Sequence, residues 1–153
     1  MARGIDTLVT QSLLDRLEGV DDGPTTRSNS LRQYRDSIKR DLEWLLNTRQ
    51  PPVPGIDRFA RARKSVIHYG LIDTSSISLA SSIDQQRLQH AVAACIEQFE
   101  PRLFDVRIVI GSDGQERRQM RFHVEAQMLL DPTPEPIAFD TMLDLTSGEY
   151  TVS

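Results

Sequence analysis

The sequence contains few of the residues that build crosslinks, metal sites and membrane spans. Among its 153 residues are one cysteine, three histidines and one tryptophan. The single cysteine, Cys95, excludes an internal disulfide and a cysteine-based metal cluster, and its place on an apolar stripe predicts a buried, inert thiol. The histidines fall on three different expected elements without ligand spacing, so we expect no metal site. No stretch approaches the ~20 apolar residues of a membrane-spanning helix, and we expect no membrane insertion.

Motifs for catalysis and cofactor binding are equally scarce. The sequence has no Gly-rich phosphate loop, nucleophile elbow or metalloprotease pattern. Glu97 and Glu100 lie three residues apart on one expected helix. The carboxylate pair of a glycosidase instead flanks a cleft, usually from different elements. We therefore predict no catalytic residues, no cofactor and no enzyme activity.

Charge is nearly balanced overall but unevenly distributed. The 18 basic and 22 acidic residues give a net charge of −4, which argues against general binding of a nucleic-acid backbone. Basic residues dominate between 27 and 64, whereas residues 122–153 include six carboxylates and no Lys or Arg. The two regions are suited to different partners. Residues 1–10 lack the basic and apolar parts of a signal peptide, so a cytoplasmic location is expected.

The first 23 residues form an amphipathic segment followed by a linker. Leu13, Leu14 and Leu17 have helical spacing, and the Gly- and Asp-rich run after them predicts a flexible connection. A helix this short is marginal in water, so the leucines need a surface to pack on. Two alternatives are open at this stage: the core of the chain itself, or a partner. Residues 24–153 are expected to form a single domain.

Three helices are predicted in the first two thirds of the chain, at 30–47, about 58–69, and 82–99. Ser30 and Ser82 each begin a capping-box pattern, with Gln three residues later. Apolar residues then recur at helical spacing.

After the last helix the apolar period changes from about 3.6 to 2, which predicts strands. The expected strands cover residues 106–110, 120–130, 137–145 and 149–152, with turns at 111–114 and 131–136. Helices followed by strands indicate an α+β domain, in which the N-terminal helices pack on one face of a small antiparallel meander of three to four strands. The alternation along the second strand predicts a polar opposite face.

The run Glu100-Pro101-Arg102 stands between the last helix and the first strand. Pro101 cannot extend the helix and moves Glu100 out of helical geometry. A carboxylate at the C-terminal end of a helix costs roughly 0.3–1 kcal/mol unless a nearby cation compensates its charge. Arg102 is the nearest cation to Glu100. Two interpretations follow. The pair either ties the helix exit to the strand or forms a rigid docking point for a partner.

Four short strings carry a family resemblance. They are SLLDRL at 12–17, DLEWLLNTR at 41–49, SVIHYGL at 65–71 and FEPRL at 99–103. In this order and spacing the chain resembles the TssE family of type VI secretion baseplate subunits, which is similar to the wedge protein of contractile phage tails and is sometimes labelled lysozyme-like. His68 departs from the pattern, because relatives often carry Asn there.

The resemblance implies a structural role with several protein partners. A TssE-like subunit would link the wedge subunits TssF and TssG and serve as the platform on which the TssB/TssC sheath begins to polymerise. The residues expected to bind partners are Glu100, Pro101 and Arg102 together with Leu13, Leu14 and Leu17. The alternative is a peptidoglycan hydrolase, which the missing export signal and the lack of an acid/base pair disfavour.

Overall fold

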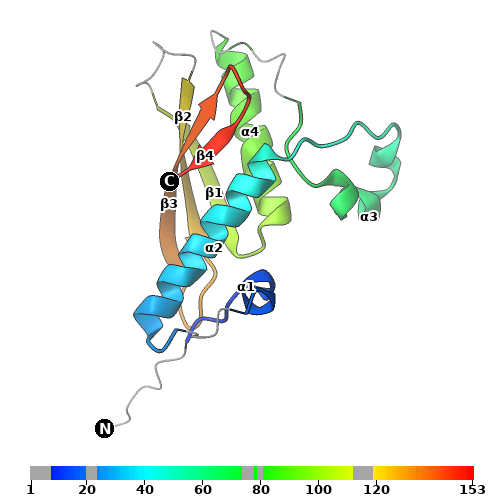
Figure 1. Ribbon diagram of the computed structural model, residues 1–153. Helices are drawn as coiled ribbons and strands as arrows, with labels where there is room; N and C mark the ends of the chain where they lie inside the picture. Colours follow the sequence, from blue (N-terminus) through cyan, green and yellow to red (C-terminus); the bar gives the residue numbers. More distant parts are fainter. Residues whose placement is uncertain (1–7, 20–23, 74–77, 79–80, 112–118) are drawn as a thin grey trace.

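The computed structural model describes residues 8–19, 24–73, 78, 81–111 and 119–153. Helices come first and strands last, as Figure 1 shows, so the predicted α+β class is confirmed. In chain order the elements are α1 (Leu13–Leu17), α2 (Arg27–Asn47), the 3₁₀ turn η1 (Ile56–Arg58), α3 (Ala60–Arg63), the 3₁₀ turn η2 (Val66–His68), α4 (Ser82–Phe99), β1 (Leu103–Ile110), β2 (Gln119–Met128), β3 (Glu135–Asp144) and β4 (Tyr150–Val152).

Helix α2 begins earlier than its sequence pattern suggests. Thr26 is the N-cap, and its hydroxyl accepts a hydrogen bond from the backbone N–H of Asn29 at 3.3 Å. The prediction that Ser30 caps the helix is therefore wrong. Ser30 is buried inside the first turn, where its hydroxyl donates to the carbonyl of Arg27 at 2.8 Å. In α4 the cap also lies earlier than predicted, by one residue, at Ser81.

The predicted continuous helix at 58–69 is wrong. The chain there forms three separate short turns, η1, α3 and η2. Ser65 helps to break the helix, since its hydroxyl accepts from the N–H of Ile67 at 3.4 Å and donates to the carbonyl of Ala62 at 2.7 Å. Ile56 is the one large apolar side chain of residues 50–70 that is buried, so no apolar stripe holds a longer helix against the core. We call residues 50–70 the excursion.

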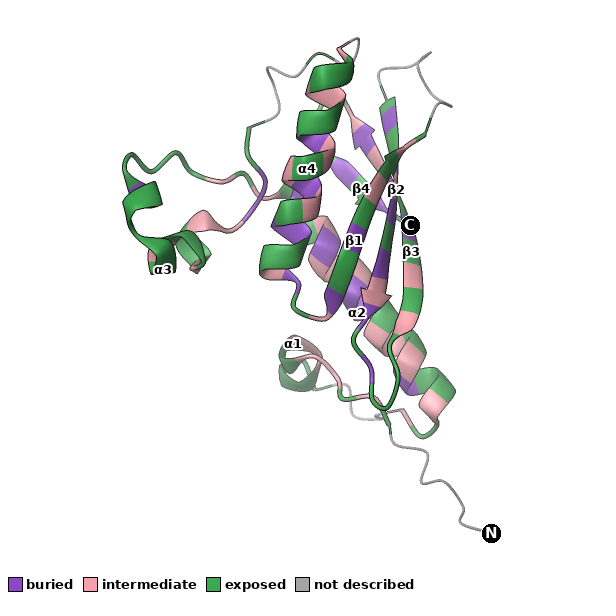
Figure 2. Ribbon diagram, turned by 180° about the vertical axis from the view of Figure 1, so that it is seen from behind, coloured by how far each residue is buried: buried purple, intermediate pink, exposed green. Residues whose placement is uncertain are grey.

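The sheet is an antiparallel meander with strand order β1-β2-β3-β4. Along β2, buried and exposed or half-buried residues alternate, as seen in Figure 2; Phe122 and Val124 point into the core and Arg121 and Glu125 lie on the open face. The predicted polar face is therefore confirmed. The third strand, β3, begins two residues earlier and ends one residue earlier than predicted, so Leu145 lies beyond it and is exposed. The predicted turn at 111–114 lies largely outside the described residues.

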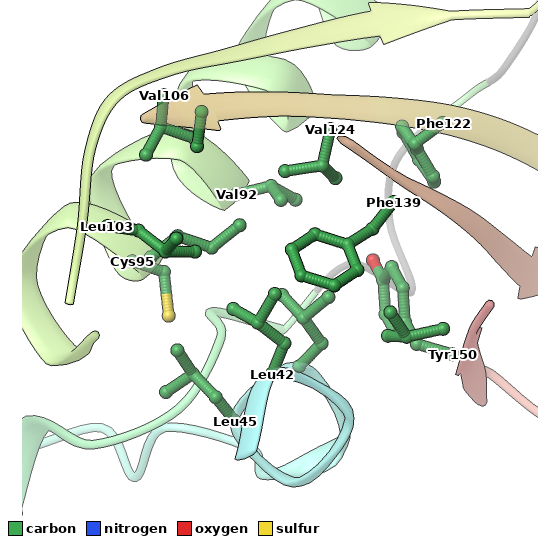
Figure 3. Packing of buried hydrophobic residues seen from close by; sticks show 14 of the residues in the cluster. Leu42, Leu45, Val92, Cys95, Leu103, Val106, Phe122, Val124, Phe139 and Tyr150 are labelled. Carbon is green, nitrogen blue, oxygen red and sulfur yellow. The ribbon is translucent and has the colours of Figure 1, made fainter. Parts of the chain in front are cut away.

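The core lies between the sheet and helices α2 and α4 (Figure 3). It is built from apolar side chains of all three, which include Leu42, Leu45, Val92, Phe122 and Phe139. Cys95 is part of this cluster, and burial raises the pKa of its thiol to about 12. The predicted buried thiol is thus confirmed.

A side-chain clip joins the end of α2 to the last strand. The Asn47 amide Nδ2 donates to the carbonyl of Tyr150 at 2.8 Å, and Asn47 Oδ1 accepts from the N–H of Tyr150 at 2.8 Å. The amide therefore satisfies both backbone groups of Tyr150, as a neighbouring strand would. Through this clip α2 lies against β4.

Candidate partner-binding site

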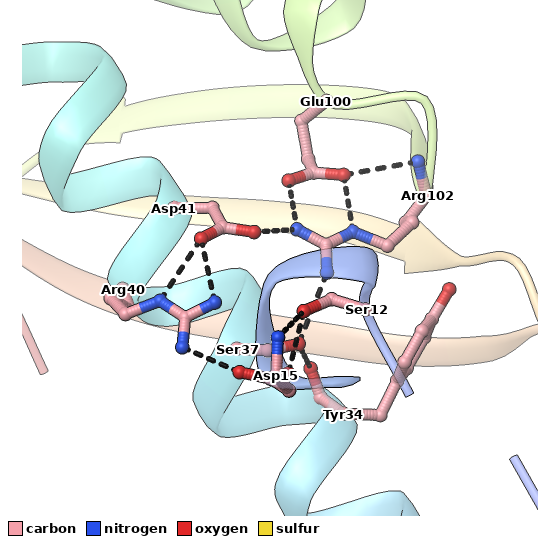
Figure 4. A network of polar contacts seen from close by, with 8 residues as sticks. All are labelled: Ser12, Asp15, Tyr34, Ser37, Arg40, Asp41, Glu100 and Arg102. Atoms are coloured by element: carbon pink, nitrogen blue, oxygen red, sulfur yellow. Dashed lines mark hydrogen bonds and ion pairs between the residues drawn. The ribbon is translucent and has the colours of Figure 1, made fainter. Parts of the chain in front are cut away.

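Glu100 and Arg102 form a closed pair at the corner between α4 and β1. The backbone N–H of Glu100 donates to the carbonyl of Ile96, and Pro101 then turns the chain. Arg102 Nε donates to Glu100 Oε1 at 2.6 Å and Arg102 Nη2 donates to Oε2 at 2.5 Å, as drawn in Figure 4. Glu100 is only 4% exposed. Both carboxylate oxygens are thus bound within the chain, and the local tie is present.

Arg102 also reaches helix α2. Its Nη1 donates to Ser37 Oγ at 3.0 Å and its Nη2 to Asp41 Oδ2 at 2.6 Å, and the guanidinium carbon lies 5.6 Å from the centre of the Tyr34 ring. Burial alone would lower the pKa of Arg102, but the hydrogen bonds and charges of Glu100 and Asp41 outweigh it and raise the pKa. Arg102 therefore stays cationic and joins the corner to α2.

A second arginine extends these contacts to α1. Asp41 Oδ1 accepts from Arg40 at 3.1 Å, and Arg40 Nη1 donates to Asp15 Oδ1 at 2.6 Å. Burial alone would raise the pKa of Asp15, but hydrogen bonds from Ser12 and Arg40 lower it. The resulting charge chain, defined as Glu100, Arg102, Asp41, Arg40 and Asp15, alternates in sign across three segments of the protein.

Sequence reasoning missed the α2 members of this charge chain. Ser37 and Asp41 lie four residues apart, which places them on the same face of α2, next to the turn that carries Ile38 and Leu42 into the core. A polar pair at that spacing beside an apolar stripe indicates a polar contact on that face of the helix but does not identify its partner.

The N-terminal segment is attached to the domain largely by polar contacts. The N–H of Val9 donates to Ser30 Oγ at 3.1 Å, and Val9 packs at the margin of the core. Helix α1 contains no buried residue: Leu13 and Leu17 are 70% and 74% exposed, and Leu14 is half-buried. The leucines therefore lie on the surface of the chain and not in its core.

A cavity of about 510 Å³ brings together most of the residues expected to bind partners. Its lining residues come mainly from α1, α2 and the α4–β1 corner. Its lining consists of Thr10, Gln11, Ser12, Leu13, Leu14, Tyr34, Asp41, Leu45, Tyr69, Phe99, Glu100, Pro101 and Arg102. Leu17 is outside this lining. Sequence alone did not indicate that the leucines and the Glu-Pro-Arg run would share one surface.

The charged groups around the cavity bond mainly to one another. Glu100 has both oxygens on Arg102, so it does not form an acid/base pair with Glu97, which is exposed on α4. In the described part of the chain, no three His, Cys, Asp or Glu side chains gather where a metal ion could bind. None of the helices among the described residues is both long and apolar enough to cross a membrane.

Residues 32–133 match the family model of the baseplate wedge protein gp25. The chain belongs to this family. The matched range contains most of α2, all of α4, β1 and β2, and the Glu100-Pro101-Arg102 corner, whereas α1, β3 and β4 lie outside it. The resemblance predicted from four short strings is thus confirmed, and the chain is a structural subunit of a baseplate. A structural family agrees with the expectation that it is not an enzyme.

The fold is also similar to that of a solved protein. A chain from "The baseplate complex from the type VI secretion system" aligns with a TM-score of 0.50 and 14% sequence identity. The alignment covers 80% of this chain and 98% of that chain. At this identity the likeness concerns the fold alone. Among the curated proteins, none matches the sequence.

Proposed function

We propose that the protein is a TssE-like subunit of a type VI secretion baseplate, acting in the cytoplasm. It links the wedge subunits TssF and TssG and serves as the platform on which the TssB/TssC sheath starts to polymerise. Family membership supports a baseplate role. The single observation that carries the docking site is the cavity in which Leu13 and Leu14 lie beside Glu100, Pro101 and Arg102.

The leucines of α1 are the apolar part of this docking site. Leu13 and Leu17 are exposed although they are among the most apolar side chains of the segment. Apolar anchors at helical spacing typically insert into a groove on a partner. We assign residues 1–23 as a docking segment and 24–153 as the folded domain, because the contacts of residues 9–17 with α2 are mainly the Asp15–Arg40 ion pair and hydrogen bonds near the surface.

Arg102 is the polar part of this docking site, but few of its N–H donors are available to a partner. An arginine has five N–H donors, and four of these are used by Glu100, Ser37 and Asp41. One donor is left for a partner carbonyl or carboxylate. Glu100 orients the guanidinium, and exposed Pro101 fixes the corner beside it. A bidentate contact with a partner therefore requires Arg102 to release one of its α2 contacts.

The edge of β3 offers a place for a strand of the sheath. The N–H of Ser153 donates to the carbonyl of Asp140, and β4 pairs only with residues 141–143 of β3. Backbone groups alternate in direction along a strand, so those of Ala138 and Pro136 also point away from β2. Among the described residues no strand covers this part of β3. An incoming sheath strand would pair there, as added strands do on open edges.

The docking site is tested by co-purification with a TssF–TssG complex. Leu13→Ser/Leu17→Ser should abolish co-purification and leave the melting temperature nearly unchanged. The matched control is Ile83→Ser/Val109→Ser, which removes two exposed apolar side chains from α4 and β1. Equal recovery of TssF–TssG with both double variants would contradict the docking role of α1.

The sheath platform is tested at one backbone N–H. Ala138→Pro removes an N–H that points away from β2, so the β2–β3 ladder keeps its hydrogen bonds. We expect normal folding by circular dichroism and failure to start TssB/TssC sheaths in electron micrographs. Ala138→Ser, which keeps the N–H, should support sheaths. Sheaths of normal number with Ala138→Pro would exclude strand addition at this edge.

A further inference from the structure

The excursion (residues 50–70) is closed at its base. Arg49 and Leu71 form a parallel β-bridge, in which the N–H of Leu71 donates to the carbonyl of Thr48 at 2.8 Å and the N–H of Gln50 donates to the carbonyl of Leu71 at 2.9 Å. Gly70, with φ of +107°, lies directly against Thr48. The two ends are thus held side by side, as in compact surface loops that carry function.

The excursion is also held at a fixed orientation. Gln98 Nε2 on α4 donates to the carbonyl of Arg63 at 2.6 Å, and Cys95 Sγ donates to the carbonyl of Gly70 at 3.2 Å. Ile56 is buried within it. In Figures 1 and 2, α3 nevertheless stands well away from the sheet. The excursion is therefore a positioned projection and not part of the core.

Its outer surface exposes large apolar side chains. Val66 is 82% exposed, Phe59 64% and Ile67 51%. They come from η2 and from the junction of η1 with α3. Single exposed apolar residues are ordinary, but three on one short projection mark a contact surface.

Four cations stand among these apolar side chains: Arg58, Arg61, Arg63 and Lys64, all exposed. Arg63 lies 3.8 Å from Asp57, and both side chains are mostly in solvent. Within the part of the chain that the structure describes, no carboxylate forms an ion pair with the other three. Their mutual repulsion makes an acidic surface the complementary partner.

We propose that the excursion docks on an acidic surface of another baseplate protein, one that offers an apolar cleft for Phe59 and Val66. This inference rests on the proposed baseplate function and adds a second contact, separate from the α1 cavity. Three of the four cations are arginines, whose planar guanidinium binds carboxylates in bidentate fashion and is enriched at protein interfaces.

Two other occupants fit the observations less well. Peripheral membrane binding typically uses a long amphipathic helix, whereas the longest helix of the excursion, α3, has 4 residues. A second copy of the chain would have to present its acidic region at 122–153, where Glu135 already contacts Arg35 and Asp140 contacts His123. Such a contact joins two different surfaces and would produce closed rings or open filaments of this chain.

The experiment measures binding of the full-length protein to a purified TssF–TssG complex at low and high salt. Arg58→Gln/Arg61→Gln/Lys64→Gln should weaken binding about tenfold and reduce its salt dependence. Phe59→Ser/Val66→Ser should weaken it about tenfold at both salt concentrations. Arg32→Gln/Arg87→Gln/Arg121→Gln removes the same charge from α2, α4 and β2 and serves as the control, with Ile83→Ser/Val109→Ser for the apolar pair.

The outcomes separate this inference from the function on which it rests. If the unmodified protein does not bind TssF–TssG, the proposed function fails. If it binds and the excursion variants bind as well as their controls, the docking role of the excursion is overturned. It is overturned too if the excursion variants lose binding only to phosphatidylserine-containing vesicles, or lose only a concentration-dependent self-association in light scattering.

Discussion

Helix α4 and the excursion are neighbours in the chain but are stabilised in opposite ways. α4 buries Leu88, Val92, Cys95 and Ile96 in one stripe, and this stripe faces β1. The excursion buries Ile56 as its only large apolar side chain and is held by backbone and side-chain hydrogen bonds. Because α4 is buried in the core, it can unfold only together with the domain, whereas the excursion is held by hydrogen bonds near the surface and can unfold locally. The contrast shows how one chain combines a buried core helix with a projecting contact surface that is fixed at its base.

The largest effect is expected from the core side of this comparison. Ile96→Ala creates a cavity at a fully buried position and should lower the free energy of unfolding by about 3–4 kcal/mol. The same change in the excursion, Ile67→Ala, removes a half-exposed side chain and should change it by less than about 0.5 kcal/mol. Urea denaturation of both variants measures the difference. Similar losses would mean that the excursion packs as core.

The second largest loss of stability is expected from breaking the charge chain. Arg102→Met leaves the Glu100 carboxylate buried without its cation, at a cost of about 3 kcal/mol. Glu100→Gln/Arg102→Met removes both charges and should recover part of that loss, as a double-mutant cycle would show. Arg107→Met, at an exposed arginine of β1, is the control and should be nearly neutral. A nearly neutral Arg102→Met would show that Glu100 is solvated.

At the base of the excursion, substitution of Gly70 should destabilise the fold. Gly70→Ala would place a Cβ 2.4 Å from the Thr48 carbonyl oxygen at a positive φ, and should cost about 2 kcal/mol or more. Gly55→Ala has a similarly positive φ but nothing within 4 Å, so it should cost about 1 kcal/mol. The difference in destabilisation between Gly70→Ala and Gly55→Ala measures the close contact with Thr48 at the base of the excursion. Thermal denaturation compares the two, and equal costs would mean that Thr48 moves away.

The smallest effect concerns the attachment of α1. Asp15→Asn weakens the contact with Arg40 and should change global stability by only about 0.5 kcal/mol. Because the folded-state pKa of Asp15 is lowered, the contact is fully present above the ordinary pKa of an aspartate and is lost as pH falls through the lowered value. The protection of the Val9 amide, measured as its exchange rate relative to the intrinsic rate at the same pH, should therefore fall in acid in the native protein. In Asp15→Asn the protection should already be low near neutral pH; unchanged protection would show that other contacts hold α1.

Sequence patterns predicted the parts of the fold in which one periodicity dominates. The alternation from Met120 to Met128 and the stripe from Leu88 to Ile96 place every buried side chain correctly. Helix starts were less well determined, because Thr26 and Ser30 are both good caps and only the long-range contact between Ser30 and Val9 separates them. The predicted helix at 58–69 was wrong for the same kind of reason. Its residues favour a helix locally, but they have no apolar stripe that could pack against the core.

The candidate site shows the same limit. The local tie between Glu100 and Arg102 was one of the two interpretations that the sequence left open, because Pro101 leaves these two residues little freedom. The contact between Arg102 and Asp41 spans 61 residues and depends on how α2 crosses the α4–β1 corner. Leu14 and that corner line the same cavity although they are far apart in the sequence. Neither is encoded in any local pattern.

The Asn47 clip has a consequence for when the domain can finish folding. Asn47 and Tyr150 are 103 residues apart, and the clip can form only after Tyr150 has been synthesised. At about 5–20 residues per second, the ribosome needs roughly 5–20 s to make the intervening chain, whereas a helix forms in about a microsecond. Until β4 has been synthesised, the part of α2 that β4 contacts in the folded domain therefore stays uncovered. Completion of the domain is tied to the end of this stretch of synthesis, and the nascent chain is most in need of protection during that interval.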